Sequence, residues 1–299
     1  MTEATEQQWT IKRLLEWTTD YFKAANPDSP RLDAEVLLSA VLGCQRVMLY
    51  TQFDRVPEPD LLARFRESVK RRGAGEPVAY IVGHWEFYSL DFEVNANVLI
   101  PRPETEHVVV AALDAAKQIT DRPLRALDIG TGSGCIAIAL AKHLDDCRIG
   151  AIDLSAAALD VATQNVTKHH LDDRIRLMQG DLFAALPKGS AKVDLIVSNP
   201  PYIGTSEQGT VDPAVRKYEP QQALFAGPDG MQVIDRLVRQ APDWLKSGGF
   251  LIFEISPLIA QRCMAQLNAV DSTGQTPWTQ INLVKDLSGK QRVIVARRK

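Results

Sequence analysis

The hydrophobic residues of the first 80 positions recur at helical spacing. Between positions 11 and 22, apolar side chains repeat every three or four residues, which predicts an amphipathic helix. A second helix should begin at Ser29, because serine caps helix starts and the proline after it suits the first turn, and should end at Gly43. A third is expected over 60–72. The pattern predicts a helical domain over residues 1–83.

From residue 84 the hydrophobic residues recur at every second position, as in a β-strand. Aromatic and β-branched residues alternate with polar ones over 84–100, which predicts a β-hairpin, and we place a hairpin linker between two domains at 84–103. From residue 125, apolar strands alternate with helices, which is typical of a parallel sheet covered on both faces. The expected strands are 127–130, 148–154, 174–180, 193–198, 249–255, 281–285 and 292–296.

The last two expected strands are separated only by residues 286–291, too few for a crossover helix, so they should pair antiparallel. We therefore expect an α/β fold. A Rossmann-like, seven-stranded, mostly parallel sheet with a C-terminal antiparallel hairpin should occupy residues 104–299, in addition to the small helical domain.

Composition narrows the class of protein. The chain has 299 residues and is 45% hydrophobic, enough for one large or two unequal domains. Its net charge of −3 argues mildly against a general nucleic-acid binder. Four cysteines without a CxxC spacing indicate reduced thiols, with neither a disulfide framework nor a metal site. The polar start lacks the apolar segment of a signal peptide, and no 18-residue apolar run exists, so we expect a cytoplasmic protein.

The most informative stretch follows the expected strand 193–198 and consists of Asn199, Pro200, Pro201 and Tyr202. Neither proline can donate a backbone hydrogen bond, so the chain should leave the sheet at Asn199 in a stiff, extended conformation. The proline carbonyls, the Asn199 amide and the Tyr202 ring would suit a planar group that carries an NH2. The simpler alternative is an ordinary loop after a strand.

A glycine-rich loop follows the first expected strand of the sheet. Gly130, Gly132 and Gly134 allow close approach of a ligand to the backbone. The dinucleotide fingerprint would need a further glycine where this chain has Cys135, so a nicotinamide oxidoreductase is disfavoured. Asp128, just before the loop, would repel phosphates and attract a cationic ligand such as S-adenosylmethionine.

Two more acidic residues end expected strands. Asp153 is placed to accept both ribose hydroxyls of a nucleoside, and Ser155 can cap the next helix in its stead. Asp181 could accept from the adenine amino group, with Leu182 and Phe183 against the ring. A single aspartate at a strand end is often only a helix cap. Four polar residues in series at the carboxyl edge of a parallel sheet, where ligands bind, are stronger evidence.

With these residues in view, the sequence resembles class I S-adenosylmethionine-dependent methyltransferases, and more narrowly the protein-(glutamine-N5) methyltransferases of the HemK/PrmC type. The resemblance covers nearly the whole chain. It rests on Ser29 to Glu35, Gly75 to Gly83, Glu86-Phe87, the run Ile100-Pro101-Arg102-Pro103-Glu104-Thr105-Glu106, the glycine loop, Asn199 to Tyr202, Tyr218 to Pro220, Asp229-Gly230 and Asp286 to Arg292. One departure is Ser256-Pro257, where the family usually has a glycine after Glu-Ile.

The resemblance implies methylation of the glutamine in the Gly-Gly-Gln motif of class-1 peptide chain release factors, with S-adenosylmethionine as cofactor and no metal. We expect Asn199, Pro200 and Tyr202 to be catalytic and to bind the substrate together with Pro201. The residues expected to hold the cofactor are Asp128, Gly130, Thr131, Gly132, Ser133, Gly134, Asp153, Asp181, Leu182 and Asn199.

We hypothesise that the Asn199 side-chain oxygen and the Pro200 carbonyl accept the two N–H bonds of the substrate amide, while Tyr202 packs on its plane. The helical domain would grip the protein substrate, or would only stabilise the catalytic domain. Segment 203–230 would form a substrate-contacting lid. We expect a monomer that forms no stable complex with nucleic acid and does not bind a membrane.

Three other functions remain open. One is the same chemistry on a ribosomal-protein glutamine, although that sister family usually departs from the Pro-Arg-Pro-Glu-Thr-Glu pattern kept here. Another is a nucleic-acid adenine N6-methyltransferase, which shares the Asn-Pro-Pro-Tyr motif but needs a positive surface. The last is a non-catalytic cofactor-binding or scaffold protein, which would be expected to have lost part of the motif set.

Overall fold

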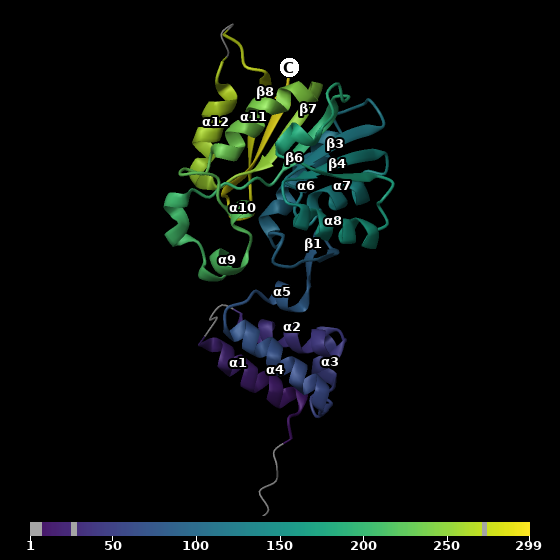
Figure 1. Cartoon of the computed structure of the whole chain (residues 1–299), viewed down its shortest axis with the longest axis vertical. Coiled ribbons are helices and arrows are strands. Elements are labelled where there is room, and N and C mark those ends of the chain that lie inside the picture. Colours follow the sequence, from purple (N-terminus) through teal and green to yellow (C-terminus); the bar gives the residue numbers. More distant parts are fainter. Residues whose placement is uncertain (1–7, 25–28, 271–273) are drawn as a thin grey trace, which may run out of the picture. The chain divides into compact units, whose positions relative to one another are not determined.

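The computed structural model describes residues 8–24, 29–270 and 274–299. The chain divides into two compact units, Met1–Gly83 and His84–Lys299, whose elements are drawn in Figure 1. The first unit is helical and the second contains both β-sheets.

The helical unit contains α1 (Ile11–Lys23), α2 (Pro30–Leu42), α3 (Arg46–Thr51), α4 (Pro59–Gly73) and α5 (Val78–Val82). The three predicted helices are confirmed as α1, α2 and α4, whereas the short α3 and α5 were not predicted. Gly43 closes α2 in the left-handed region, as expected, but the Ser29 side chain makes no capping bond. Ile11, Leu15 and Phe22 form the buried face of α1, while Trp17 and Tyr21 are about half exposed.

The second unit begins with a two-stranded hairpin, β1 (His84–Phe87) and β2 (Leu90–Glu93). Its two-residue turn places Tyr88 and Ser89 at positive φ, the geometry that matches the twist of paired strands. The hairpin is shorter than the segment 84–103 assigned to it from the sequence, because residues 94–102 form a loop that leads to the short 3-10 helix η1 (Pro103–Thr105).

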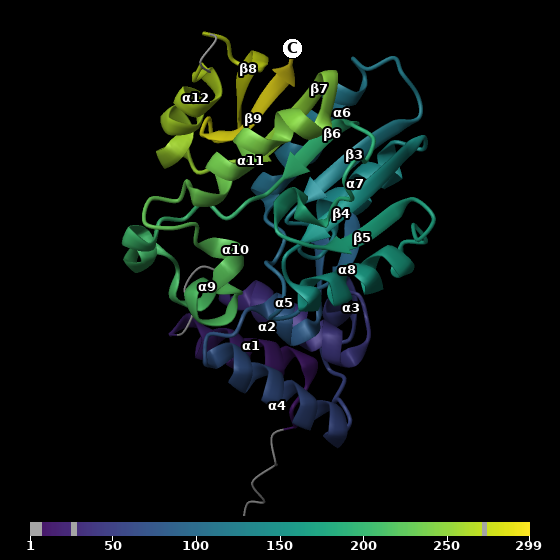
Figure 2. The same ribbon diagram turned by 45° about the horizontal axis from the view of Figure 1, so that its top comes forward.

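The main sheet has seven strands in the order β5-β4-β3-β6-β7-β9-β8. The first five run parallel, and β9 pairs antiparallel with both β7 and β8, which confirms the predicted fold and the C-terminal hairpin. Figure 2 shows β8 and β9 beyond β7. The strands are β3 (Leu124–Ile129), β4 (Cys147–Asp153), β5 (Ile175–Gln179), β6 (Val193–Ser198), β7 (Leu245–Glu254), β8 (Trp278–Lys285) and β9 (Gln291–Arg298).

Five longer helices pack against this sheet. They are α6 (Glu106–Ala116), α7 (Cys135–His143), α8 (Ala156–Lys168), α11 (Gln232–Trp244) and α12 (Ala260–Asn268). Helices α6, α7 and α8 lie side by side, and α11 packs on α12. Ile234 and Leu237 of α11 share a buried apolar cluster with Leu251 and Phe253 of β7. The carboxyl ends of the five parallel strands lie at one edge of the sheet that these helices cover.

Segment 203–230, which follows the Asn-Pro-Pro-Tyr stretch and was predicted to be a lid, contains three short helices. They are η3 (Thr205–Thr210), α9 (Pro213–Tyr218) and α10 (Gln221–Leu224), and Ile203 forms an isolated bridge with Phe225. Another short helix, η2 (Leu182–Ala185), follows β5. At the departure from the family pattern, Pro257 begins η4 (Pro257–Ile259) and the Ser256 hydroxyl accepts a hydrogen bond from the Leu258 amide at 3.2 Å.

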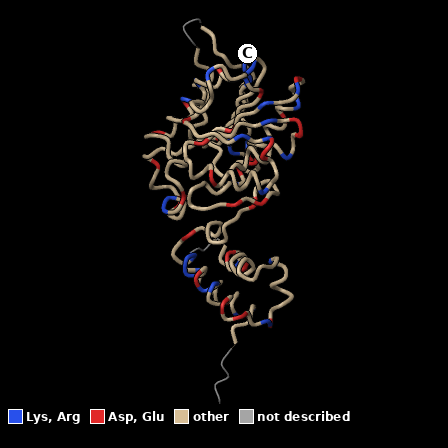
Figure 3. The backbone as a smooth tube through the Cα atoms, turned by 45° about the vertical axis from the view of Figure 1, so that its right-hand side comes forward, with Lys and Arg blue, Asp and Glu red and all other residues tan. Residues whose placement is uncertain are grey.

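All four cysteines are free thiols, as predicted, and three of them are buried. None of the helices in the described ranges combines the length and apolar character that crossing a bilayer requires. Figure 3 shows acidic and basic residues interspersed along both units. Over the residues that the structure describes, neither unit therefore presents a long run of charge of one sign along its backbone.

Candidate functional site

A cleft with a volume of about 240 Å³ lies at the carboxyl edge of the parallel strands. Its walls come from the segments that follow β3, β4, β5 and β6, and from residues 97–101. Nine of the residues predicted from the sequence line it: Gly130, Thr131, Gly132, Ser133, Asp153, Asp181, Leu182, Asn199 and Pro201. The other four, Asp128, Gly134, Pro200 and Tyr202, are not among its lining residues.

The glycine loop is held open by its own backbone geometry. Gly132 has a φ of +56°, and a β-carbon added there would meet no atom within 4 Å, so its surroundings are open. Its amide donates a hydrogen bond to Asp153 Oδ2 at 2.8 Å. Gly134 has a φ of +83° and immediately precedes α7. The loop is therefore braced against the end of β4 and leaves space for a ligand.

Asp153 lines the cleft, but it is less free than the sequence suggested. Ser155 caps α8 as predicted, accepting from the Ala158 amide at 3.2 Å. Even so, Asp153 Oδ1 accepts from the Ser155 amide at 2.9 Å, while Oδ2 bonds Gly132. Burial raises the pKa of this carboxyl. Each carboxylate oxygen has a second lone pair that a ligand hydroxyl can use.

Asp128 is fully buried and faces the loop from behind. Its Oδ2 accepts from the Thr131 hydroxyl at 2.6 Å and from the Ala137 amide at 3.2 Å. Burial raises its pKa to about 7. The expected direct contact between this carboxylate and a cationic ligand needs correction, because the side chain ties the loop to α7 and does not line the cleft.

The end of β5 also differs in part from the prediction. Asp181 is half exposed and pairs with Arg236 of α11 at 2.8 Å, and both residues line the cleft. Leu182 lines the cleft as well, in a backbone conformation with φ of +52°. Phe183 is buried and stacks on Trp244, with ring centroids 5.9 Å apart. The expectation that Phe183 lies against a ligand ring is therefore wrong.

A chain of hydrogen bonds starts at Asn199. Its Nδ2 donates to Thr105 Oγ1 at 3.1 Å, and the Thr105 hydroxyl donates to Glu254 Oε2 at 2.5 Å. The Tyr202 hydroxyl donates to the other oxygen, Glu254 Oε1, at 2.9 Å. Burial is the main cause of the raised pKa of Glu254. Tyr202 thus faces Glu254 with its hydroxyl, and the packing of its ring on a substrate amide stays a prediction.

The Pro-Arg-Pro-Glu-Thr-Glu run is anchored to segment 203–230. Glu219 is buried, and its carboxylate accepts from Arg102 Nη2 at 2.6 Å and from the Ile100 amide at 3.3 Å. Pro220, directly after Glu219, lines the cleft. Four residues of these networks had no role predicted from the sequence: Thr105, Glu219, Glu254 and Arg236. Thr105 and Glu219 belong to quoted motifs, and Glu254 ends a strand, which are the signals that could have identified them.

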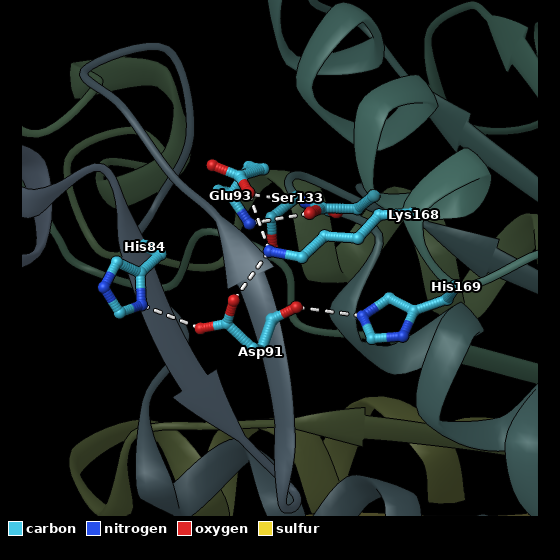
Figure 4. Close-up of polar contacts among 7 residues, drawn as sticks. His84, Asp91, Glu93, Ser133, Lys168 and His169 are labelled. Carbon is cyan, nitrogen blue, oxygen red and sulfur yellow. Dashed lines mark hydrogen bonds and ion pairs between the residues drawn. The ribbon is translucent and has the colours of Figure 1, made fainter. Parts of the chain in front are cut away.

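A second polar cluster connects the hairpin to the glycine loop. Figure 4 shows Asp91 between His84, Lys168 and His169, and these contacts measure 2.6–2.9 Å. The buried Asn165 of α8 also bonds the backbone of Glu93 and donates to the Ser133 carbonyl at 2.9 Å. The hairpin and the cleft loop are therefore fastened to the same helix.

Comparisons with known proteins agree with this geometry. Residues 13–83 match the family model described as PrmC N-terminal domain, and residues 107–216 match the Methyltransferase small domain. A release factor glutamine methyltransferase of Rhodopirellula baltica is 49% identical over 290 residues, covering 96% of this chain and 95% of the relative. The chain belongs to the release factor glutamine methyltransferase family.

Another member of this family, from Geobacter sulfurreducens, is 40% identical and covers 99% of both chains. Among solved structures, the hMettl16 catalytic domain in complex with the MAT2A 3′UTR hairpin 6 superposes with a TM-score of 0.55 at 16% identity, covering 82% of this chain and 84% of that one. At that identity the likeness concerns the fold alone. The chain is therefore a methyltransferase by family, on a fold that other methyltransferases share.

The helical unit has a cavity of its own, with a volume of about 320 Å³, between α1 and α4. Trp17 and Tyr21 stack at its wall with ring centroids 5.4 Å apart. The charged residues that line it, Arg66 and Lys70, are both basic.

Proposed function

We propose that this protein transfers a methyl group from S-adenosylmethionine to the side-chain amide of the glutamine in the Gly-Gly-Gln motif of class-1 release factors. The observation that carries the proposal is the Asn199 amide at the cleft. Its nitrogen is committed to Thr105 at 3.1 Å, so its oxygen remains for a donor on the substrate. A glutamine side chain offers such a donor, its NH2 group.

The cleft fits the chemistry of a nucleoside that carries a charged sulfur. The Asp153 carboxylate suits a ribose diol, Leu154 and Leu182 give apolar walls, and the glycine loop leaves its backbone accessible. When bound, S-adenosylmethionine supplies an electrophilic methyl group. We propose that Asp153, Asp181, Leu182 and the loop 130–134 hold it.

The protein's own contribution is to position the amide. We assign the two N–H acceptors to Asn199 Oδ1 and the Pro200 carbonyl, because no donor among the described residues bonds the Pro200 oxygen. During transfer, the N–C bond would form as the methyl–sulfur bond breaks, its electron pair would stay on the sulfur as a neutral thioether, and the amide nitrogen would release one proton to solvent. Fixed oxygen acceptors stabilise the positive charge that develops on the nitrogen. Tyr202, whose hydroxyl is held by Glu254, would pack its ring on the plane of the amide.

The test is mass spectrometry of a recombinant release factor incubated with the protein and S-adenosylmethionine. We expect a gain of one methyl group on the glutamine of the tripeptide. Asn199→Ala should lower kcat by ~100-fold or more, as loss of a preorganised charge-stabilising group does, and should leave cofactor affinity within a few-fold. Methylation of a ribosomal-protein glutamine or of adenine, in place of the release factor, would refute the assignment.

Cofactor binding can be tested separately by isothermal titration. Asp153→Ala should weaken the affinity for S-adenosylmethionine by ~10-fold or more, because charge-assisted hydrogen bonds to the ribose are lost. The matched control is Asp160→Ala on α8, an exposed residue that is not among those lining the cleft. Equal affinity in the two variants would exclude Asp153 from the cofactor site.

We further propose that the helical unit recognises the protein substrate and that segment 203–230 contacts it near the target. The aromatic stack and basic lining of the α1–α4 cavity suit a protein segment with an apolar anchor beside acidic residues. Gln222 and Ala223 of α10 line the active cleft. Trp17→Ala should raise KM for an intact release factor and leave KM for a Gly-Gly-Gln peptide unchanged. The exposed Val47 serves as control through Val47→Ala.

A further inference from the structure

The carboxylate behind Asn199 is unusually enclosed. Glu254 and Thr105 are each only 1% exposed, and they come from the end of β7 and from η1. Both Glu254 oxygens accept hydrogen bonds from hydroxyl groups, Thr105 at 2.5 Å and Tyr202 at 2.9 Å. A buried carboxyl group is costly unless it is hydrogen-bonded, and these two bonds meet that need.

The direction of each hydrogen bond follows from the inventory of donors. A threonine hydroxyl has one hydrogen, and in this contact Glu254 Oε2 is the acceptor. When Thr105 gives its hydrogen to Glu254, its oxygen can only accept from Asn199. Asn199 must then turn its NH2 toward Thr105, and its oxygen faces the other way.

This constraint matters because the two ends of a side-chain amide have almost the same shape. Packing alone therefore does not distinguish the two orientations of Asn199. If the Asn199 amide were flipped, its NH2 group would face the NH2 group of the substrate. Both groups are hydrogen-bond donors, so no hydrogen bond could form between them. A mismatch of this kind leaves a buried polar group unpaired, which costs far more than the packing difference.

We propose that Thr105 and Glu254 are positioning residues that orient the Asn199 amide with its oxygen toward the substrate. By doing so, they select a substrate group that donates N–H over one that only accepts, an amide over a carboxylate. This rests on the proposed function, because it assumes that Asn199 receives the substrate amide. Glu254 accepts the hydroxyl hydrogen of Thr105, and the Thr105 oxygen therefore accepts from the Asn199 NH2 group. The Asn199 oxygen is then left to face the substrate.

The experiment compares Thr105→Val, which keeps the shape and removes the hydroxyl, with Thr105→Ser, which keeps the hydroxyl. With a release factor and S-adenosylmethionine, Thr105→Val should lower kcat by ~10- to 100-fold. This loss is smaller than the one expected for Asn199→Ala, which removes a direct contact with the substrate. Thr105→Ser should stay within ~3-fold of the unaltered protein, and both should bind S-adenosylmethionine with affinity within ~3-fold, since the hydroxyl acts on Asn199. Glu254→Gln should resemble Thr105→Val, because a glutamine NH2 can donate to Thr105 and reverse the chain.

A double variant separates positioning from a general structural effect. If Thr105 acts through Asn199, then Asn199→Ala combined with Thr105→Val should be no slower than Asn199→Ala alone, within ~2-fold. If the loss of kcat in the double variant equalled the product of the losses in the two single variants, the proposal would be overturned. Full kcat in Thr105→Val, or equal damage from Thr105→Ser and Thr105→Val, would also overturn it.

A readout that does not need turnover keeps this inference distinct from the proposed function. By NMR, the Asn199 side-chain NH2 should exchange slowly with solvent in the unaltered protein and in Thr105→Ser, and rapidly in Thr105→Val. If the unaltered protein failed to methylate a release factor, the proposed function would fall while this measurement still tested the orientation. Rapid exchange in the unaltered protein would refute the hydrogen bond itself.

Discussion

Asn165 lies in the last turn of α8, and its side-chain amide bonds both the β2 strand and the glycine loop. Its Oδ1 accepts from the Glu93 amide at 2.7 Å, and its Nδ2 donates to the carbonyls of Glu93 at 3.0 Å and Ser133 at 2.9 Å. The side chain is 0% exposed. We predict that Asn165→Leu, which keeps most of the volume, removes all three bonds and leaves their backbone partners unpaired.

The magnitude follows from those bonds. Each contributes ~1 kcal/mol net, and unpaired buried backbone groups add to the cost, so the free energy of unfolding of the unit His84–Lys299 should fall by ~2–4 kcal/mol. A two-stranded hairpin is marginal by itself. The backbone amides of β2 should therefore lose protection from hydrogen exchange before those of the main sheet.

The assay is urea denaturation combined with hydrogen exchange. The matched control is Thr163→Ala on the same helix, whose exposed hydroxyl bonds only the Leu159 carbonyl of its own helix at 2.7 Å, and which should change stability by less than ~0.5 kcal/mol. Because Ser133 lines the cleft, Asn165→Leu should also weaken the affinity for S-adenosylmethionine. A loss of stability below ~1 kcal/mol, with β2 protection unchanged, would refute this account of how the hairpin is held.

Two further predictions concern residues that support the site without lining the cleft. The pKa of Asp128 is about 7 in the fold, above its ordinary value, so the unfolded chain ionises first as pH rises. The free energy of unfolding should therefore fall between pH ~4 and ~7, by up to ~4 kcal/mol, and denaturation of Asp128→Asn across that range should show a flatter profile. Gly230→Ala should lower kcat by ~10-fold or more in the methylation assay, because Gly230 has a φ of +76° and a β-carbon would collide with the Tyr202 carbonyl. Gly209→Ala, with open space around it, should not.

The elements and their order were largely predictable because they follow from local patterns. Strand β6 begins and ends where its apolar run does, and the two prolines after it forbid further pairing. Parallel strands place their carboxyl ends at one edge, so Asp153, Asp181 and Asn199 were expected to meet, and all three line one cleft. The family resemblance found from the quoted motifs is confirmed by relatives that match nearly the whole chain.

The hydrogen-bond partners were not predictable in the same way. Thr105 and Glu254 stand far apart in the chain, and only the packing of η1 against the end of β7 brings them within 2.5 Å. Phe183 likewise became a core residue because Trp244 of α11 offered it a stacking face. The spacing of apolar and polar residues predicts the helix or strand in which each partner lies. It does not predict which residue of a distant segment that partner will contact.

The sequence by itself determined which side chains reach the edge of the sheet, because strand length and chain direction are local properties. Tertiary structure alone decided which way each side chain turns there. Asp128 and Asp153 both stand at or near strand ends, yet one is enclosed beneath the loop by α7 and the other faces the cleft. The physical reason is that a polar group is oriented by the donors and acceptors that surround it, and those come from segments distant in the chain.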